Sequence, residues 1–418
     1  MELFLTPLYI DPGTGSMLFT ILLGIVGAAF YSLRMLFIKL RYKIGGGKLD
    51  LSAQKIPLVI FSDHKRYWSI FEPICRELNK RGEKVVYITA SADDPVLTCG
   101  YENVTAECIE NENKLFTKLN YLNAGVVLST TPSLDVYQWK RSKNVLYYVH
   151  IPHAASEIVL YRMFGIDYYD AILLSGDYQI ADVRYLEKLR GLPEKELLKV
   201  GIPYMDEMAK KLAEAPAVGE HPRTVLLAPS WGPSAIFGVY GEKILELLVQ
   251  TGYHIIVRPH PQSFSSEKEM LDKLMEKYPD SENLEWNRDM DNFDVLHRSD
   301  ILISDFSGVI FDFSLVHNKP VIYTNPNFDV SVYDYKWMDT PLWTHSALPR
   351  IGRELTEESM ENIKELIDSC LTDEQYAEGI RAVKEETWAN IGDSAAIVAD
   401  YLVNKCDELL GRKEEKDG

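Results

Sequence analysis

The chain has 418 residues, a formal net charge of -18 at pH 7 and 46% hydrophobic residues. This length accommodates two α/β domains with large cores, and the negative charge argues against a nucleic-acid surface as the main partner. The five cysteines are odd in number and form no CxxC pair. The sequence therefore predicts neither a disulfide framework nor a zinc site, and a reducing, cytoplasmic setting fits best.

The first recognisable element is an uncharged apolar stretch between Pro12 and Leu33. It is long enough to cross a bilayer as a helix, and the basic residues that follow it, from Arg34 to Lys48, favour the cytoplasmic side for the later chain. A buried or interfacial amphipathic helix is the alternative. We predict a single-pass transmembrane helix and a basic juxtamembrane segment over 1–48, which anchors the chain in the cell membrane with its globular part on the cytoplasmic face.

Strand and helix patterns alternate after a flexible triple-glycine joint. The short apolar runs that predict strands are 57–61, 84–89, 125–128, 144–149, 171–174, 224–228, 254–257, 301–303 and 321–324. The amphipathic stretches that predict helices between them are 68–81, 180–189, 243–250 and 267–277. Two such halves predict an α/β fold in which two Rossmann-like domains face a cleft.

A proline-rich, charged segment near 215–222 separates the two halves, and the chain after 356 has a helical pattern to 410. The segments that we expect to follow the membrane helix are a first Rossmann-like domain at 52–215, a second at 222–372, C-terminal helices at 373–410 and a disordered tail at 411–418.

Two histidine-containing clusters follow predicted strands. His150 and His153 come after the run NVLYYV, and Arg258 and His260 come after HIIV. Because parallel strands end at the same edge of a sheet, these side chains are expected at the cleft. Histidine titrates near neutral pH and serves as a general base, while arginine offers a planar fork for phosphate oxygens. Structural histidines and a rigid proline-flanked turn are the alternatives.

Two further clusters follow strands in the second half. Ser230 lies after TVLLAP, and the stretch from Ser304 to Gly308 separates a strand from a helix that contains Asp312. The helix start favours phosphate, and an acid in the first turns suits a ribose, although simple helix capping explains the same residues. Asp289 and Asp291 have the spacing of a metal–nucleotide site, but a loop that caps the next helix is the simpler interpretation. We predict no metal and no cofactor.

These motifs resemble the CDP-glycerol glycerophosphotransferase family, which includes the teichoic-acid primases and polymerases of bacterial cell walls and has a two-domain GT-B type fold. The resemblance rests on LLAPSW, RPHP and SDILISDFSGVIFDFSLVHNKPVIY, which occur in the family's order and spacing between 226 and 323. The chain departs from the family pattern at Gly308, where the family has a second serine.

The resemblance implies an enzyme that moves glycerol phosphate, or another polyol phosphate, from a CDP-activated donor to a hydroxyl of a lipid-linked envelope glycan. It implies that His153 or His150 deprotonates the acceptor, with His260 as the third catalytic histidine. The residues that it assigns to the donor are Arg258, Ser230, Ser304, Asp305, Ser307, Gly308 and Asp312. The alternatives are a UDP-sugar glycosyltransferase or 2-epimerase of the same fold, and a non-catalytic, membrane-tethered scaffold.

Overall fold

The computed structural model describes residues 25, 26, 33, 54–289, 291–305, 307–324 and 329–412. The chain divides into two units, Met1–Gln54 and Lys55–Gly418, and the second unit carries the fold described below. The predicted transmembrane segment lies almost entirely outside the described residues, as does most of the predicted tail. No helix within the described ranges has both the length and the apolar character that a bilayer crossing requires.

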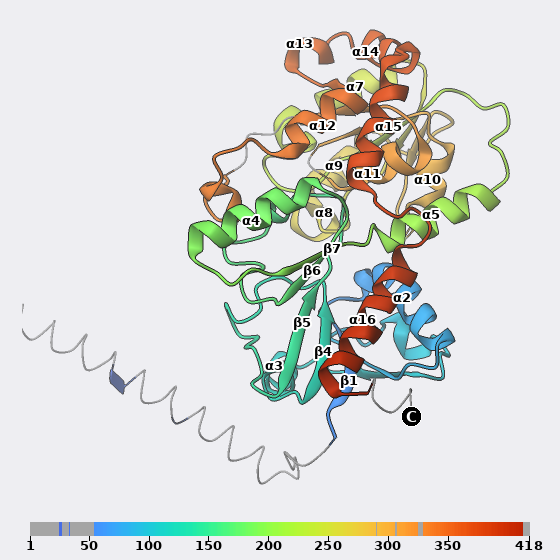
Figure 1. Cartoon of the computed structure of the whole chain (residues 1–418). Helices are drawn as coiled ribbons and strands as arrows, with labels where there is room; N and C mark the ends of the chain where they lie inside the picture. The colour runs from blue at the N-terminus through green and yellow to red at the C-terminus, as the bar shows by residue number, and fades with distance from the viewer. Residues whose placement is uncertain are drawn as a thin grey trace, which may run out of the picture. The chain divides into compact units, whose positions relative to one another are not determined.

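The first sheet has seven parallel strands in the order β3-β2-β1-β4-β5-β6-β7 (Figure 1). Its strands are β1 (Ile56–Ser62), β2 (Val85–Thr89), β3 (Val104–Cys108), β4 (Ala124–Ser129), β5 (Val145–His150), β6 (Ala171–Leu174) and β7 (Glu196–Lys199). The sheet and the helices that pack on it form what we call the first lobe.

The second sheet has six parallel strands in the order β10-β9-β8-β11-β12-β13. Its strands are β8 (Thr224–Ala228), β9 (His254–Val257), β10 (Leu284–Trp286), β11 (Ile301–Ser304), β12 (Val321–Tyr323) and β13 (Gly352–Glu354). This sheet and its helices form the second lobe. The prediction of two Rossmann-like parallel sheets is confirmed.

Helices connect the strands in both lobes. They are α2 (Trp68–Lys80), α3 (Glu112–Asn120), α4 (Tyr178–Arg190), α5 (Pro203–Glu214), α6 (Ile236–Tyr240), α7 (Lys243–Gln250), α8 (Ser263–Ser266), α9 (Lys268–Lys277), α10 (Phe293–Arg298), α11 (Val309–Phe311), α12 (Trp343–Ile351), α13 (Glu357–Met360), α14 (Ile363–Thr372), α15 (Gln375–Thr387) and α16 (Ser394–Leu410). Short helical turns are η1 (Lys65–Tyr67), η2 (Pro95–Thr98), η3 (Ile158–Leu160), the π-helical η4 (Asp312–Val316) and η5 (Asp334–Trp337).

Burial explains which strands the sequence predicts. Every residue of the central strands β4 and β8 is buried, so these segments are continuous apolar runs. The edge strands β3 and β7 contain no fully buried residue, and their mixed sequences VTAEC and ELLK gave no strand prediction. The short strands β10 and β13 were missed for the related reason that three residues carry too little pattern.

The C-terminal helix α16 packs on the first lobe although the chain reaches it from the second (Figure 1). It lies against α2, β1 and β4, and the Cys406 thiol near its end donates to the carbonyl of Pro57 at 3.2 Å. The turn before α16 is held by Asp206 of α5, whose carboxylate accepts hydrogen bonds from Trp388, Gly392 and Ser394 at 2.8–3.0 Å. The two lobes are therefore connected by more than the linker between β7 and β8.

A second set of contacts joins the lobes beyond β5. The buried Glu157 carboxylate accepts from the backbone N–H of Thr344 at 2.6 Å. The backbone N–H of Asp334 donates to the carbonyl of Tyr161 at 3.0 Å, and Arg190 forms an ion pair with the buried Asp334 carboxylate. These contacts fix the loop after β5, which carries His153, against the second lobe.

Candidate active site

Each sheet has one point where the strand order reverses, and loops from both points carry the candidate site. In the first sheet this point lies between β1 and β4, and in the second it lies between β8 and β11. The connections that leave these two neighbouring strands pass to opposite faces of the sheet. They leave a crevice between them at the carboxyl ends of the strands, where ligands bind in folds of this class. Arg66 follows β1, Ser230 follows β8, and Asp305 follows β11.

His150 ends β5 and is fully enclosed. Its side chain is 0% exposed, its Nε2 lies 3.1 Å from the Tyr161 hydroxyl, and its ring packs against Tyr169 at a centroid distance of 4.9 Å. Burial, together with the neighbouring His153, lowers the pKa of His150 to about 3. The ring is therefore neutral at pH 7 and belongs to the framework that supports the loop.

His153 lies three residues later, in the loop beyond the strand. Its ring is 5.2 Å from the Tyr67 ring and 6.0 Å from the Tyr161 ring. Burial first, and the charge of Arg66 second, lower its pKa to about 4, and its Nδ1 has no hydrogen-bond partner. This Nδ1 atom is buried, and a neutral imidazole keeps one ring nitrogen whose lone pair can accept a proton.

The His153 loop meets the second lobe at the turn after β11. A Cβ atom built on Gly308 would lie 3.6 Å from the Cβ atom of Ala154. The positive charge of Arg66 lowers the pKa of His260 as well as that of His153, so one cation influences a histidine from each lobe. The His153 loop therefore meets the Gly308 turn, and His260 follows β9, whose carboxyl end lies at the same edge of the second sheet as that of β11.

The side chains of Ser304 and Asp305 are used inside the protein. The Ser304 hydroxyl is buried and donates to the carbonyl of Ala228 at 2.6 Å. The fully buried Asp305 carboxylate accepts from the backbone N–H groups of Ser230, at 3.0 and 3.1 Å, and Ile236, at 3.1 Å. These two residues join β11 to the loop after β8 and so position the groups that line the crevice.

Ser307 and Gly308 are partly exposed and form the turn itself. The Ser307 hydroxyl accepts from the backbone N–H of Val309 at 3.5 Å. Gly308 has φ -58, which any residue can adopt, so the structure requires no glycine there. Their contact with a donor phosphate is a prediction that the geometry permits.

His260 is oriented by its own loop. Its Nδ1 accepts a hydrogen bond from the backbone N–H of Gln262 at 3.1 Å, which leaves the proton of the neutral ring on Nε2. Burial is the main cause of its lowered pKa, and Arg66 lowers it further, while Glu267 opposes the shift. His260 is therefore suited to donate a hydrogen bond to an anion.

Arg258 lies at the end of β9 and its guanidinium bonds to the Asn287 side chain. Burial lowers its pKa, whereas Asp289 and Asp291 raise it. Asp291 accepts from the backbone N–H of Phe293 at 2.9 Å, in the turn that directly precedes α10. Among the described residues, no group of three or more metal-ligating side chains is present.

Asp312 lies in the π-helical turn η4, the kind of helical irregularity that is frequent at functional sites. Its carboxylate accepts from the Tyr204 hydroxyl of α5 at 2.8 Å. Burial raises its pKa to about 6, and the hydrogen bonds from Tyr204 and Asn292 moderate that shift. In the structure this carboxylate joins η4 to α5. Its role as a ribose ligand stays a prediction.

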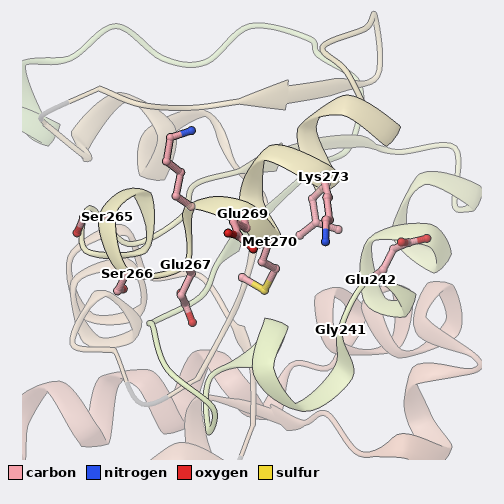
Figure 2. A pocket seen from close by; sticks show the side chains of 10 residues that line it. Gly241, Glu242, Ser265, Ser266, Glu267, Glu269, Met270 and Lys273 are labelled. Carbon is pink, nitrogen blue, oxygen red and sulfur yellow. The ribbon is translucent and has the colours of Figure 1, made fainter.

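A cavity of about 780 Å³ opens between the α6–α7 turn and helices α8 and α9. Figure 2 shows its lining, in which Glu267, Glu269 and Lys273 lie around Met270. None of the predicted site residues lines it. It is linked to the loop after β8 through Glu267, whose carboxylate accepts from the backbone N–H of Gly232 at 2.9 Å. The chemistry is therefore better sought at the strand ends than in this cavity.

Arg66 is the residue at the crevice that the sequence patterns did not single out. It is exposed, its Cζ lies 4.8 Å from the Tyr67 ring centroid, and its Nη2 donates to the Tyr67 hydroxyl at 2.9 Å. The available signal was its position in a charged loop, DHKR, directly after the first strand. Only the folded structure shows that this loop lies beside His153.

Comparison with known proteins relates the chain to one family. A model described as CDP-Glycerol:Poly(glycerophosphate) glycerophosphotransferase matches residues 167–403. The teichoic acid glycerol-phosphate primase of Bacillus subtilis (strain 168) is 27% identical over 174 residues, which are 39% of this chain and 41% of that protein. The alignment thus spans less than half of the curated relative.

Solved structures of similar fold extend over most of the chain. A variant of the wall teichoic acid polymerase TagF soaked with CDPG has a TM-score of 0.54 at 17% identity, over 92% of this chain and 99% of that one. The UDP-GlcNAc 2-epimerase of Neisseria meningitidis, bound to UDP-GlcNAc, has a TM-score of 0.53 at 14% identity, over 84% and 100%. These likenesses show the two-domain GT-B-like fold that the sequence predicted.

Proposed function

Because the chain belongs to the CDP-glycerol:poly(glycerophosphate) glycerophosphotransferase family, we propose that it transfers glycerol phosphate from CDP-glycerol to a hydroxyl group of a growing envelope polymer or its primer. The observation that carries this proposal is the approach of the His153 loop in the first lobe to the Ser307–Gly308 turn in the second, with His260 following a strand that ends at the same edge of the second sheet. A base from one lobe and anion-binding groups from the other are what an in-line attack on phosphorus needs.

In this mechanism His153 takes the proton of the acceptor hydroxyl. The hydroxyl oxygen attacks the phosphorus that carries glycerol, the bond from that phosphorus to the bridging oxygen of the diphosphate breaks, and CMP leaves with the electron pair. The products are a phosphodiester, CMP and a proton on His153. His260 donates a hydrogen bond from Nε2 to the diphosphate, where negative charge grows as CMP departs.

His153 is a better candidate for the base than His150. Both rings are neutral at pH 7, but His150 is 0% exposed and is enclosed by Tyr161 and Tyr169, whereas His153 lies in the loop that meets Gly308. The low pKa of the free enzyme's His153 makes it a weak base. An anionic donor beside it opposes that shift and brings the pKa closer to the working pH.

The decisive experiment incubates the full-length protein separately with CDP-glycerol and with UDP-N-acetylglucosamine, with a short-chain alkyl glycerol phosphate as acceptor. Release of CMP, with formation of a longer phosphodiester, supports the proposal. Release of UDP, or epimerisation of the sugar, supports instead a UDP-sugar enzyme of the same fold. Repeating the assay with an alkyl disaccharide as acceptor separates priming from chain extension.

Substitution of His153, the proposed base, is compared with substitution of a histidine outside the crevice. His153→Ala is expected to lower kcat by about 10²–10⁴, while His345→Ala, at an exposed histidine of α12, leaves it unchanged. Equal rates for the two variants would contradict the assignment of His153. Loss of activity in His150→Ala together with a lowered melting temperature fits the enclosed position of that ring.

We also propose that the stretch 12–33 anchors the chain in the cell membrane, with the lobes on the cytoplasmic face near a lipid-linked acceptor. The uncharged stretch and the basic residues after it support this proposal. Protease protection in sealed vesicles tests it: a tag fused after residue 418 should be digested only when the cytoplasmic face is exposed. Recovery of the full chain in the supernatant without detergent would count against an anchor.

A further inference from the structure

Arg66 lies at the point where the strand order of the first sheet reverses, in the turn η1 that directly follows β1. Its guanidinium rests on the Tyr67 ring and bonds to the Tyr67 hydroxyl. Within the part of the chain that the structure describes, it forms no ion pair with a carboxylate. In a protein of net charge -18, an exposed arginine without an acidic partner in a crevice is available to an anionic ligand.

The position of Arg66 relates it to the reacting groups. Tyr67, on which it stacks, is 5.2 Å from the ring of His153, and the next residue of that loop, Ala154, contacts the Gly308 turn of the second lobe. The charge of Arg66 is also felt at His260. A group that is attacked beside His153, where this loop meets the Gly308 turn, would lie close to the guanidinium that stacks on Tyr67.

We propose that Arg66 is a further catalytic residue, whose guanidinium binds the oxygens of the phosphoryl group while it moves from CMP to the acceptor hydroxyl. This inference rests on the proposed function. Charge spreads over the non-bridging oxygens as the bond to the leaving oxygen breaks and the bond to the acceptor oxygen forms, and the planar fork of an arginine matches two of these oxygens. Arg66 supplies this charge from the lobe opposite to the donor turn.

The test compares Arg66→Gln and Arg66→Lys with Lys65→Gln, the neighbouring cation of η1 that is already paired with Asp93. We expect Arg66→Gln to lower kcat by about 10²–10³ with the KM for CDP-glycerol changed less than about threefold. Arg66→Lys keeps the charge but loses the fork, so it should recover only part of kcat. Lys65→Gln should behave as the unmodified protein.

A pH profile separates catalysis from a purely structural role. The groups that face His153 are Arg66 and Tyr67 from η1, Tyr161 after η3, and His150 from β5. Arg66 is the cation among these groups, and its removal raises the pKa of His153. The acid limb of the kcat/KM profile should therefore move to higher pH in Arg66→Gln. In Arg66→Lys, which keeps the charge, the limb should lie where it does in the unmodified protein. Loss of a packing contact alone would leave the limb in place.

Two outcomes would overturn the inference while the proposed function stands. One is an unchanged kcat in Arg66→Gln. The other is a raised KM for the alkyl glycerol phosphate with kcat unchanged, which would assign Arg66 to the phosphate of the acceptor. If the unmodified protein releases no CMP from CDP-glycerol with any acceptor, the proposed function itself fails, and the role of Arg66 in phosphoryl transfer fails with it.

Discussion

The carboxylate of Asp305 offers the sharpest test of how the donor side of the crevice is built. It is fully buried and accepts three hydrogen bonds from two backbone N–H groups of the loop 229–236. The isosteric change Asp305→Asn keeps one acceptor oxygen and places an NH₂ group against an N–H group. At least one charge-assisted hydrogen bond is lost, so the free energy of unfolding should fall by about 2–4 kcal/mol.

A matched control exists in Asp206, which accepts from the N–H groups of Trp388, Gly392 and Ser394 in the turn before α16, rather than from groups of the loop 229–236. Asp206→Asn removes the same kind of interaction and should reduce stability in urea denaturation to a similar degree. The two variants should differ in donor binding. Because a loosened loop must be ordered again before it can hold a ligand, Asp305→Asn should raise the Kd for CDP-glycerol by at least about tenfold.

Calorimetry with CDP-glycerol and hydrogen exchange of the amides in 229–236 measure these effects. Faster exchange confined to that loop in Asp305→Asn, with normal exchange there in Asp206→Asn, is the expected pattern. If Asp305→Asn binds CDP-glycerol as tightly as the unmodified protein while its loop exchanges faster, this loop does not belong to the donor site. If its stability is unchanged, the hydrogen-bond argument is wrong.

Three further predictions concern single groups. Gly308→Ser should fold normally, because its Cβ atom meets Ala154 at an ordinary 3.6 Å, and its new hydroxyl should lower the KM for CDP-glycerol by up to about tenfold, an effect that Gly308→Ala should not reproduce. Tyr204→Phe removes a donor to Asp312 and should raise the pKa of that carboxyl above about 6, which infrared spectroscopy detects as a protonated carboxyl band absent from Asp312→Asn. Acid should destabilise the fold in part through His150, whose pKa of about 3 lies below its unfolded value. The unfolded ring takes up a proton below about pH 6.5 while the folded ring does not, so the contribution of this ring to stability should fall by about 2 kcal/mol between pH 7 and pH 5. Urea denaturation should therefore show a loss over this range that is smaller by about 2 kcal/mol in His150→Gln than in the unmodified protein.

The sequence predicted the interior of the fold better than its margins. The boundaries of β6, β8, β9 and α7 agree with the predicted ranges, because buried strands and strongly amphipathic helices have long, consistent patterns. The edge strands β3 and β7 did not stand out, since a half-exposed strand mixes polar and apolar residues without a clear period.

The candidate site was predicted in part for a related reason. Clusters at strand ends are local in sequence, so His150, His153, Arg258 and His260 were found from the strands that precede them. Which histidine is enclosed depends on Tyr161 and Tyr169, which the sequence does not connect to it. Arg66 was missed because its importance arises from tertiary contacts alone.

The same limit applies to the acidic residues of the donor turn. A carboxylate directly after a strand predicts a ligand contact, yet Asp305 holds the loop after β8 and Asp312 joins η4 to α5. Both carboxylates face protein donors, N–H groups for Asp305 and a hydroxyl for Asp312. Sequence patterns identify that such residues lie at the site but not which way their side chains point.

This use of the acidic residues bears on how an acidic protein can bind an anionic donor. The net charge of -18 disfavours a nucleoside diphosphate at long range, and unpaired carboxylates at the strand ends would add to that repulsion. Instead, Asp305 and Asp312 are buried against protein donors, whereas Arg66 is exposed and without an acidic partner in the described part of the chain. These placements reduce the negative charge that the strand ends present to an anionic ligand. Raising the ionic strength screens the distant carboxylates more than the short contacts inside the crevice, so affinity for CDP-glycerol should depend only weakly on salt, unlike binding that relies on surface charge alone.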